Sequence, residues 1–143
     1  MRRRSSRLSP WISTSTGHRA YAELAGKTPH AAKEAIAKAL AEMERDINSG
    51  GLGTEGDLAF HMAIAAATKN PLQIYIMKNV SDFLHVGIRE NLLHLYQDPD
   101  NIVEILKQHR AIYEAIRCRD PEAAYGAMKN HITFVIHFFS SRE

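Results

Sequence analysis

The sequence predicts an all-α protein, an antiparallel helical bundle of about six helices. Apolar residues recur at helical spacing along most of the chain, and an alternation of period two is nowhere sustained. Every proline also follows a residue that is favoured as a helix N-cap. Proline suits the first position of a helix, because its missing N–H needs no partner there. These dipeptides are Ser9-Pro10, Thr28-Pro29, Asn70-Pro71, Asp98-Pro99 and Asp120-Pro121.

The last four of these dipeptides mark predicted helix starts, and short turns are expected to join antiparallel neighbours. The cluster from Asn48 to Gly53 is the clearest break in the chain, and Thr54 is expected to cap the helix that follows it. In order along the chain, we expect helices at 18–26, 29–48, 54–69, 71–97, 99–118 and 121–140.

The bulk composition is that of one soluble globular domain. The chain has 143 residues, of which 45% are hydrophobic and 24% charged. No apolar run approaches the roughly 20 residues of a membrane span, and no signal-peptide pattern opens the chain, so we expect a cytoplasmic protein without membrane partners. Cys118 is the only cysteine, which excludes an intrachain disulfide and leaves histidine and carboxylate as metal ligands.

Positive charge is concentrated at the start of the chain. Five of the 18 basic residues are Arg2, Arg3, Arg4, Arg7 and Arg19, and removing them leaves 13 basic against 16 acidic residues, a net charge of −3. The body is therefore expected to bind nucleic acid poorly by itself. We divide the chain into residues 1–28, a basic, Ser/Thr-rich tail or the remnant of a first helix, and a helical domain at 29–143.

Asp57 and His61 lie four residues apart in a mostly apolar run, Gly56 to Pro71. On a helix this spacing leaves two side chains about 40° apart around the axis and about 6 Å apart along it, so they share a face. That face continues through apolar positions and is expected to point inward. Buried polar groups need partners. The plainer interpretation is that these two side chains hydrogen-bond to each other or to the backbone.

Two further histidines occupy positions in apolar stripes. His109 lies between Leu106 and Ile112, and His131 follows Met128 on another predicted helix. One such histidine is usually a core residue with a local partner, but two on separate helices, beside an inward Asp/His pair, indicate a common site. The remaining histidines lack this geometry and are interpreted as surface or packing residues: His18, His30, His85, His94 and His137.

Three neutral imidazoles and one carboxylate suit a divalent transition metal, with zinc the first choice and nickel, manganese, iron and cobalt also compatible. The expected ligands are Asp57, His61, His109 and His131. An ion of charge +2 beside one carboxylate leaves the site positive, and a six-coordinate ion keeps two positions for water or an anion. The sequence therefore predicts a site that attracts a small carboxylate metabolite.

Three segments carry a resemblance to a known family: DLAFHMAIAAATKNP, QHRAIYEAIRCRDPEAA and MKNH. They resemble the effector-binding C-terminal (FCD) domain of FadR-subfamily GntR transcription regulators, over about residues 30–140. The resemblance implies an all-helical bundle whose metal ligands are Asp57, His61, His109 and His131. It also implies that a small carboxylate, bound at or beside the metal, alters the affinity of a homodimer for its operator.

The resemblance also sets an expectation about DNA. Members of this family carry a winged helix-turn-helix of some 70 residues before the FCD domain, and residues 1–28 are too short to supply it. We therefore expect DNA binding only from a full-length regulator, of which this chain is a fragment or a truncated product. Arg89, in the predicted helix 71–97, is a candidate partner for an effector carboxylate, and a solvated arginine is the alternative.

Two other functions remain open at this point. A metal-dependent hydrolase would need a general base beside a metal-bound water, and Glu55, Glu104 and Glu114 have no defensible spacing to the ligand face. A purely structural ion would clamp three helices through a closed site. We expect a sensing domain and no enzyme activity.

Overall fold

Five α-helices follow one another along the described part of the chain. The computed structural model describes residues 30–141, apart from the side chains of 80, 82–88, 90–91 and 139. The helices are α3 (His30–Asn48), α4 (Thr54–Ala67), α5 (Pro71–Leu95), α6 (Pro99–Arg117) and α7 (Pro121–Ser140), and residues 30–141 contain no strand. The all-α prediction is confirmed, with helix ends within two residues of those expected. The predicted helix at 18–26 and the basic tail lie outside the described residues.

Three helices begin at the predicted caps. The Asn70 side chain accepts a hydrogen bond from the Leu72 amide at 3.0 Å, and Asp98 accepts one from Asp100 at 3.0 Å. Asp120 makes the same kind of bond to a backbone amide of α7. These bonds satisfy amides that have no partner within the helix, which explains why the helices start at these dipeptides.

The expectation that Thr54 caps α4 is wrong. The residue at the cap is Gly53, which has a left-handed φ of 66° and makes no side-chain cap bond. Its amide instead donates to the Asp46 carboxylate at 2.7 Å. The chain needs a positive φ to turn from α3 into α4, and glycine adopts that conformation without the steric cost of a side chain.

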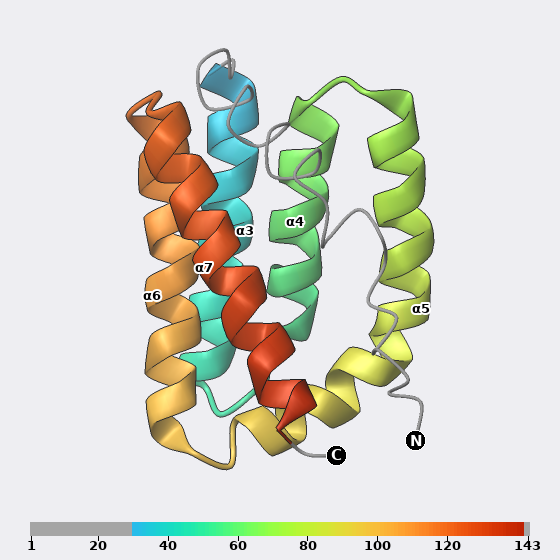
Figure 1. Cartoon of the computed structure of the whole chain (residues 1–143), viewed down its shortest axis with the longest axis vertical. Coiled ribbons are helices and arrows are strands. Elements are labelled where there is room, and N and C mark those ends of the chain that lie inside the picture. Colours follow the sequence, from blue (N-terminus) through green and yellow to red (C-terminus); the bar gives the residue numbers. More distant parts are fainter. Residues whose placement is uncertain (1–29, 142–143) are drawn as a thin grey trace, which may run out of the picture.

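The helices run up and down in sequence order (Figure 1). α3 packs against α4 and α6, α6 packs against α7, and α4 packs against α5. The C-terminal part of α5 turns beneath the other helices (Figure 1). Short connections between consecutive helices favour this antiparallel arrangement. None of the described helices combines the length and the apolar character that crossing a membrane would require.

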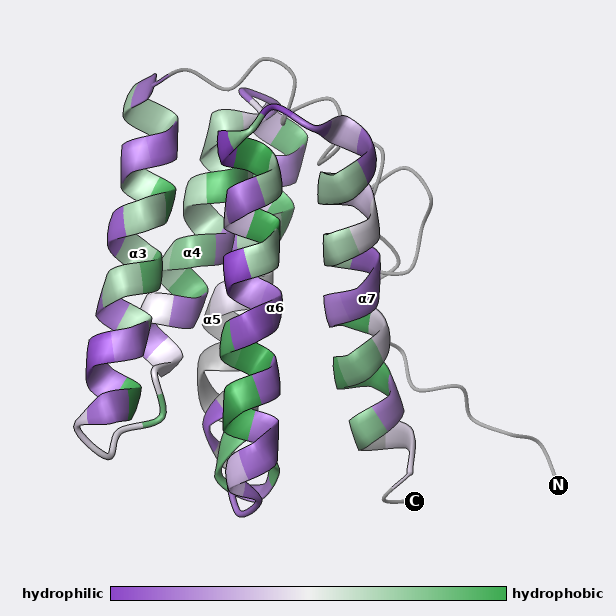
Figure 2. Ribbon diagram, turned by 90° about the vertical axis from the view of Figure 1, so that its left-hand side faces the viewer, coloured by the Kyte–Doolittle hydropathy of each residue, from purple (hydrophilic) through white to green (hydrophobic). Residues whose placement is uncertain are grey.

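Two apolar clusters form the core, and a layer of polar side chains lies between them on α6. The first cluster includes Phe60 and Ile64 of α4 with Ile112 of α6, and the second includes Leu95 of α5 with Ile105 of α6. Bands of hydrophilic and hydrophobic residues alternate along α6 in Figure 2, as expected for a helix with one buried and one exposed face.

Candidate metal centre

Asp57 follows the point where α4 comes closest to α3. Gly56 is buried, and a Cβ placed on it would lie 2.4 Å from the backbone nitrogen of Met43. Only a residue without a side chain allows this approach. Asp57 follows directly, and His61 stands one turn further along the same helix. The two side chains are only 16% and 15% exposed, so the predicted inward face is confirmed.

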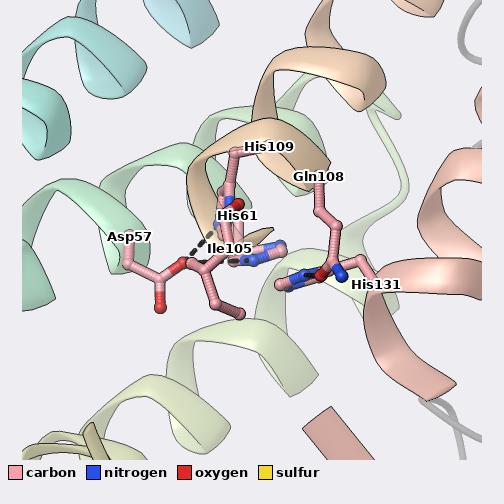
Figure 3. Close-up of polar contacts among 6 residues, drawn as sticks. All are labelled: Asp57, His61, Ile105, Gln108, His109 and His131. Carbon is pink, nitrogen blue, oxygen red and sulfur yellow. Dashed lines mark hydrogen bonds and ion pairs between the residues drawn. The ribbon is translucent and has the colours of Figure 1, made fainter. Parts of the chain in front are cut away.

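Three histidines from three helices meet in the interior. His61 comes from α4, His109 from α6 and His131 from α7, and their side chains gather in one place (Figure 3). One ring nitrogen from each forms a set in which no two atoms are more than 4.8 Å apart. The rings of His61 and His131 are nearly parallel, at 17°, with centroids 5.5 Å apart. His109 and His131 are 1% and 5% exposed.

Asp57 joins this group through a single carboxylate oxygen. Its Oδ1 lies 2.7 Å from Nε2 of His109 and 3.4 Å from Nε2 of His61 (Figure 3). The structure therefore brings together all four residues that the sequence singles out. It also contains the Asp57–His61 contact of the plainer interpretation, at 3.4 Å, although the hydrogen bond of Asp57 is made with His109 of another helix, at 2.7 Å.

The surroundings of His109 restrict what can lie between it and Asp57. Its Nδ1 lies 2.8 Å from the carbonyl oxygen of Ile105, which can only accept, so Nδ1 carries a hydrogen. Nε2 then faces a carboxylate oxygen at 2.7 Å. An unprotonated Nε2 and a carboxylate oxygen would repel each other at this distance. A cation must therefore lie between or beside them, either a proton or a metal ion. The backbone contact thus directs Nε2 of His109 toward the site, as in many metal-binding histidines.

A buried amide supports His131. Gln108, which is 3% exposed, places its Oε1 3.0 Å from Nδ1 of His131, and its Nε2 donates to Oε1 of Glu104 at 2.9 Å. The other oxygen of Glu104 lies 3.7 Å from the ammonium of Lys107 at the surface. A chain of polar contacts therefore runs from solvent to the histidine cluster. Gln108 was not predicted as a site residue, and its only signal in the sequence is its place beside His109 and one turn after Glu104.

Burial and hydrogen bonding act in opposite directions on the charges of the site. Burial raises the pKa of Asp57, but the hydrogen bonds and charge interactions with His109 and His61 together outweigh it and hold the pKa well below its ordinary value. Burial lowers the pKa of His131 well below its ordinary value, helped by the neighbouring His109 and His61. The site therefore holds an ionised carboxylate and a neutral imidazole at pH 7, the forms that bind metal.

A buried hydroxyl lies near the same carboxylate. Tyr96, at the C-terminal end of α5, packs against the second apolar cluster, which contains Ile105. Burial raises the pKa of Tyr96, and the negative charge of Asp57 raises it further, so the phenol stays protonated. Its hydroxyl oxygen is inaccessible to solvent and has no hydrogen-bond partner among the described residues. Such orphaned groups are uncommon in folded proteins.

The donor set has nearly the dimensions that a transition metal requires. Two nitrogens bound to one zinc ion at about 2.1 Å lie at most about 4.2 Å apart. In the structure no two of the three ring nitrogens are more than 4.8 Å apart. Side-chain movements of less than an ångström therefore bring all three within reach of one ion. The ionised oxygen of Asp57 beside them completes a set of nitrogen and oxygen donors suited to zinc and similar ions.

The other candidate residues lie apart from this cluster. Arg89 is exposed on α5, Glu114 pairs with Arg117 at 2.8 Å, and Glu104 reaches the site only through Gln108. His30, His94 and His137 are exposed, as expected, whereas the side chains of His18 and His85 lie outside the described residues.

The chain matches a known domain family over most of its length. The FCD domain family model matches residues 18–134. The HTH-type transcriptional regulator LutR of Bacillus subtilis is 34% identical over 112 residues, which cover 78% of this chain and 51% of LutR. The Glc operon transcriptional activator of Escherichia coli is 30% identical over 79 residues, covering 55% of this chain and 31% of the activator.

The HTH-type transcriptional repressor NanR of Citrobacter rodentium is 32% identical over 100 residues, which cover 70% of this chain and 38% of NanR. The chain therefore spans about half the length of LutR and less of the other two relatives. All three are named as transcription regulators, not enzymes.

Proposed function

Because this chain belongs to the FCD domain family, we propose that it is the metal-containing, ligand-sensing domain of a GntR/FadR-type transcription regulator. In this proposal Asp57, His61, His109 and His131 hold one divalent transition metal, zinc in the first place and nickel, manganese, iron or cobalt as alternatives. The effector is a small carboxylate metabolite.

One observation carries the proposal: three imidazoles from three helices converge beside an ionised carboxylate inside the bundle. Buried titratable groups are costly unless they are paired or bind a ligand. Packing of the interior by itself needs apolar side chains, and does not account for three histidines and an aspartate gathered there. A divalent ion bound there supplies a net positive centre with coordination positions open to an anion.

A buried hydroxyl supports a carboxylate as the effector. The hydroxyl of Tyr96 is a donor without a partner among the described residues, and it lies within the electrostatic reach of Asp57. Hydrogen bonds to charged acceptors are stronger than those between neutral groups. Arg89, exposed on α5, is a second candidate partner for an effector carboxylate.

The location of the ligands relates effector binding to regulation. They belong to α4, α6 and α7, so a ligand that alters their spacing also alters how these helices pack. We expect the regulator to act in the cytoplasm as a homodimer. We expect a winged helix-turn-helix of the full-length protein to contact DNA. Residues 30–141 form no part of such a module.

A purely structural ion is the second candidate, and the near-complete burial of His109 and His131 favours it. A metal-dependent hydrolase lacks support because neither Glu104 nor Glu114 is free to serve as a base beside the cluster.

The deciding experiment measures metal content and effector-dependent melting. We expect about one divalent transition metal per purified chain, lost in His109→Ala or His131→Ala. A screen of lactate, pyruvate, malate, citrate and sugar acids should raise the Tm with at least one compound, because a ligand at a hundred times its Kd stabilises the fold by about 2.7 kcal/mol. Asp57→Ala should lose that shift.

The outcomes separate the two candidates. If metal is bound and no carboxylate changes the Tm, the ion is structural. If wild-type protein that has been loaded with zinc and never exposed to chelator retains no metal, both candidates are wrong.

A further inference from the structure

The hydrogen-bonding capacities of three side chains determine which nitrogen of His131 faces the cluster. The carboxylate of Glu104 lies 3.7 Å from the ammonium of Lys107 through one oxygen, and the oxygens of a carboxylate can only accept hydrogen bonds. The group of Gln108 that lies 2.9 Å from Glu104 must therefore be its NH₂ end. That contact orients the whole amide.

The orientation of the amide then determines the tautomer of the histidine. With its NH₂ end on Glu104, Gln108 presents its carbonyl oxygen to Nδ1 of His131, at 3.0 Å. This oxygen cannot donate, so the ring must carry its hydrogen on Nδ1. Nε2 is left with a free electron pair, and Nδ1 cannot ligate. For His109, the backbone carbonyl of Ile105 likewise requires a hydrogen on Nδ1, so only Nε2 of His109, which faces Asp57, can ligate.

We propose that Gln108, oriented by Glu104, is a positioning residue that holds His131 as the Nδ1–H tautomer and so presents Nε2 for metal binding. Glu104 and Gln108 lie one turn apart on α6. Gln108 reaches across to His131 on α7 (Figure 3). Partners of this kind change metal affinity by about 10- to 100-fold when they are removed. The proposal has two tests. The first, of the tautomer of His131, is independent of the proposed function, whereas the second, of metal affinity, rests on it.

The tautomer test uses protein freed of metal by chelation. Nitrogen-15 NMR of the imidazole rings distinguishes a protonated Nδ1 from a protonated Nε2. We expect His131 to be protonated on Nδ1 in the wild type. Gln108→Leu, which has a similar volume but no acceptor, should give a mixture of the two tautomers. A folded Gln108→Leu protein in which His131 keeps a pure Nδ1–H tautomer would overturn the proposal.

The metal test measures zinc affinity by competition with a chelator. Gln108→Leu should weaken zinc binding by about 10- to 100-fold. Glu104→Gln should weaken it less, because a glutamine there can present either end of its amide to Gln108. Glu114→Gln makes the same exchange on an exposed part of α6 and should leave the affinity unchanged.

Exchanging the two residues provides the sharpest control. In the double variant Glu104→Gln, Gln108→Glu, the carboxylate next to His131 can only accept, and the amide at 104 donates to it. We expect this variant to recover the Nδ1–H tautomer and the zinc affinity that Glu104→Gln loses. Glutamate and glutamine have nearly the same shape, so a role in packing alone predicts no loss in Glu104→Gln and therefore nothing to recover. If Gln108→Leu does not fold, Glu104→Gln and the double variant decide the question.

If wild-type protein binds zinc and all these variants bind it equally, the inference about Gln108 is wrong and the proposed function stands. If wild-type protein binds no zinc, the proposed function fails, and the tautomer measurement still tests the role of Gln108.

Discussion

At the scale of single residues, Tyr96 combines a stability cost with a proposed binding role. Its buried hydroxyl has no partner among the described residues, and leaving such a group unpaired costs about 1–3 kcal/mol. We expect Tyr96→Phe to raise the free energy of unfolding of the effector-free protein by about 1 kcal/mol. The effector-dependent Tm shift should become smaller in the same variant. Both are read from thermal melts with and without the best carboxylate.

The matched control is Tyr75→Phe. Tyr75 is 66% exposed on α5, so its hydroxyl is hydrated and its removal should change neither quantity. A Tyr96→Phe protein that is less stable than wild type would show that the hydroxyl has a structural partner.

His131 gives the protein a pH dependence whose sign follows from its lowered pKa. In the unfolded chain this histidine titrates near 6.5, whereas in the fold it stays neutral to lower pH. Below about pH 6.5 the unfolded state therefore binds more protons, and the free energy of unfolding falls as the pH falls. The slope for one group is at most about 1.4 kcal/mol per pH unit.

Urea denaturation of chelator-treated protein at pH 7.5 and pH 5.5 measures this effect. His131→Gln cannot titrate and should lose less stability than wild type over that range. Equal losses in the two proteins would contradict a buried, neutral His131. Asp57 does not interfere, because its contribution is present above its unfolded pKa of 3.8 and is lost only at lower pH.

At the scale of the helices, replacing glycine by alanine is expected to change the stability of the fold in opposite directions at Gly56 and Gly126. A Cβ on Gly56 would lie 2.4 Å from the backbone nitrogen and 2.5 Å from the Cα of Met43, so α3 and α4 would have to separate. A Cβ on Gly126 would meet nothing within 4 Å. We expect Gly56→Ala to destabilise the fold by about 1–3 kcal/mol, and Gly126→Ala, in the interior of α7, to stabilise it by about 0.5–1 kcal/mol.

Thermal or urea unfolding of the two variants checks this pair. Gly56→Ala should also weaken metal binding, because Asp57 is the next residue and moves with α4. A Gly56→Ala protein as stable as wild type would mean that α3 and α4 do not approach as closely as described, and a destabilised Gly126→Ala protein would contradict the open space at Gly126.

At the scale of the whole molecule, the proposed ion ties α7 to the rest of the bundle. α7 packs mainly against α6, and His131 is the residue through which it would share an ion with α4. Metal binding should therefore slow amide hydrogen exchange in α7 more than in the first turns of α3, which lie away from the site. Exchange measured with excess zinc and with chelator checks this expectation. Equal protection of both segments would contradict it, and His131→Ala should abolish the difference.

The sequence by itself determined the helices and the residues on their inner faces. Caps and prolines act within one turn, so Asn70, Asp98 and Asp120 predicted three helix starts without knowledge of the fold. Apolar stripes are equally local, and they correctly assigned Asp57 and the three histidines to buried faces. Position in a stripe says which way a side chain points, and four inward polar groups were enough to suggest one site.

Only the tertiary structure decided how these groups meet and what holds them. The contact of Asp57 with His109 joins residues 52 positions apart, and that of His131 with Gln108 joins two helices, so neither follows from local spacing. The orphaned hydroxyl of Tyr96 and the lack of space at Gly56 are likewise properties of what surrounds them. Hydrogen-bond direction and steric fit depend on distances of a few tenths of an ångström between distant segments, and helical periodicity fixes no such distance.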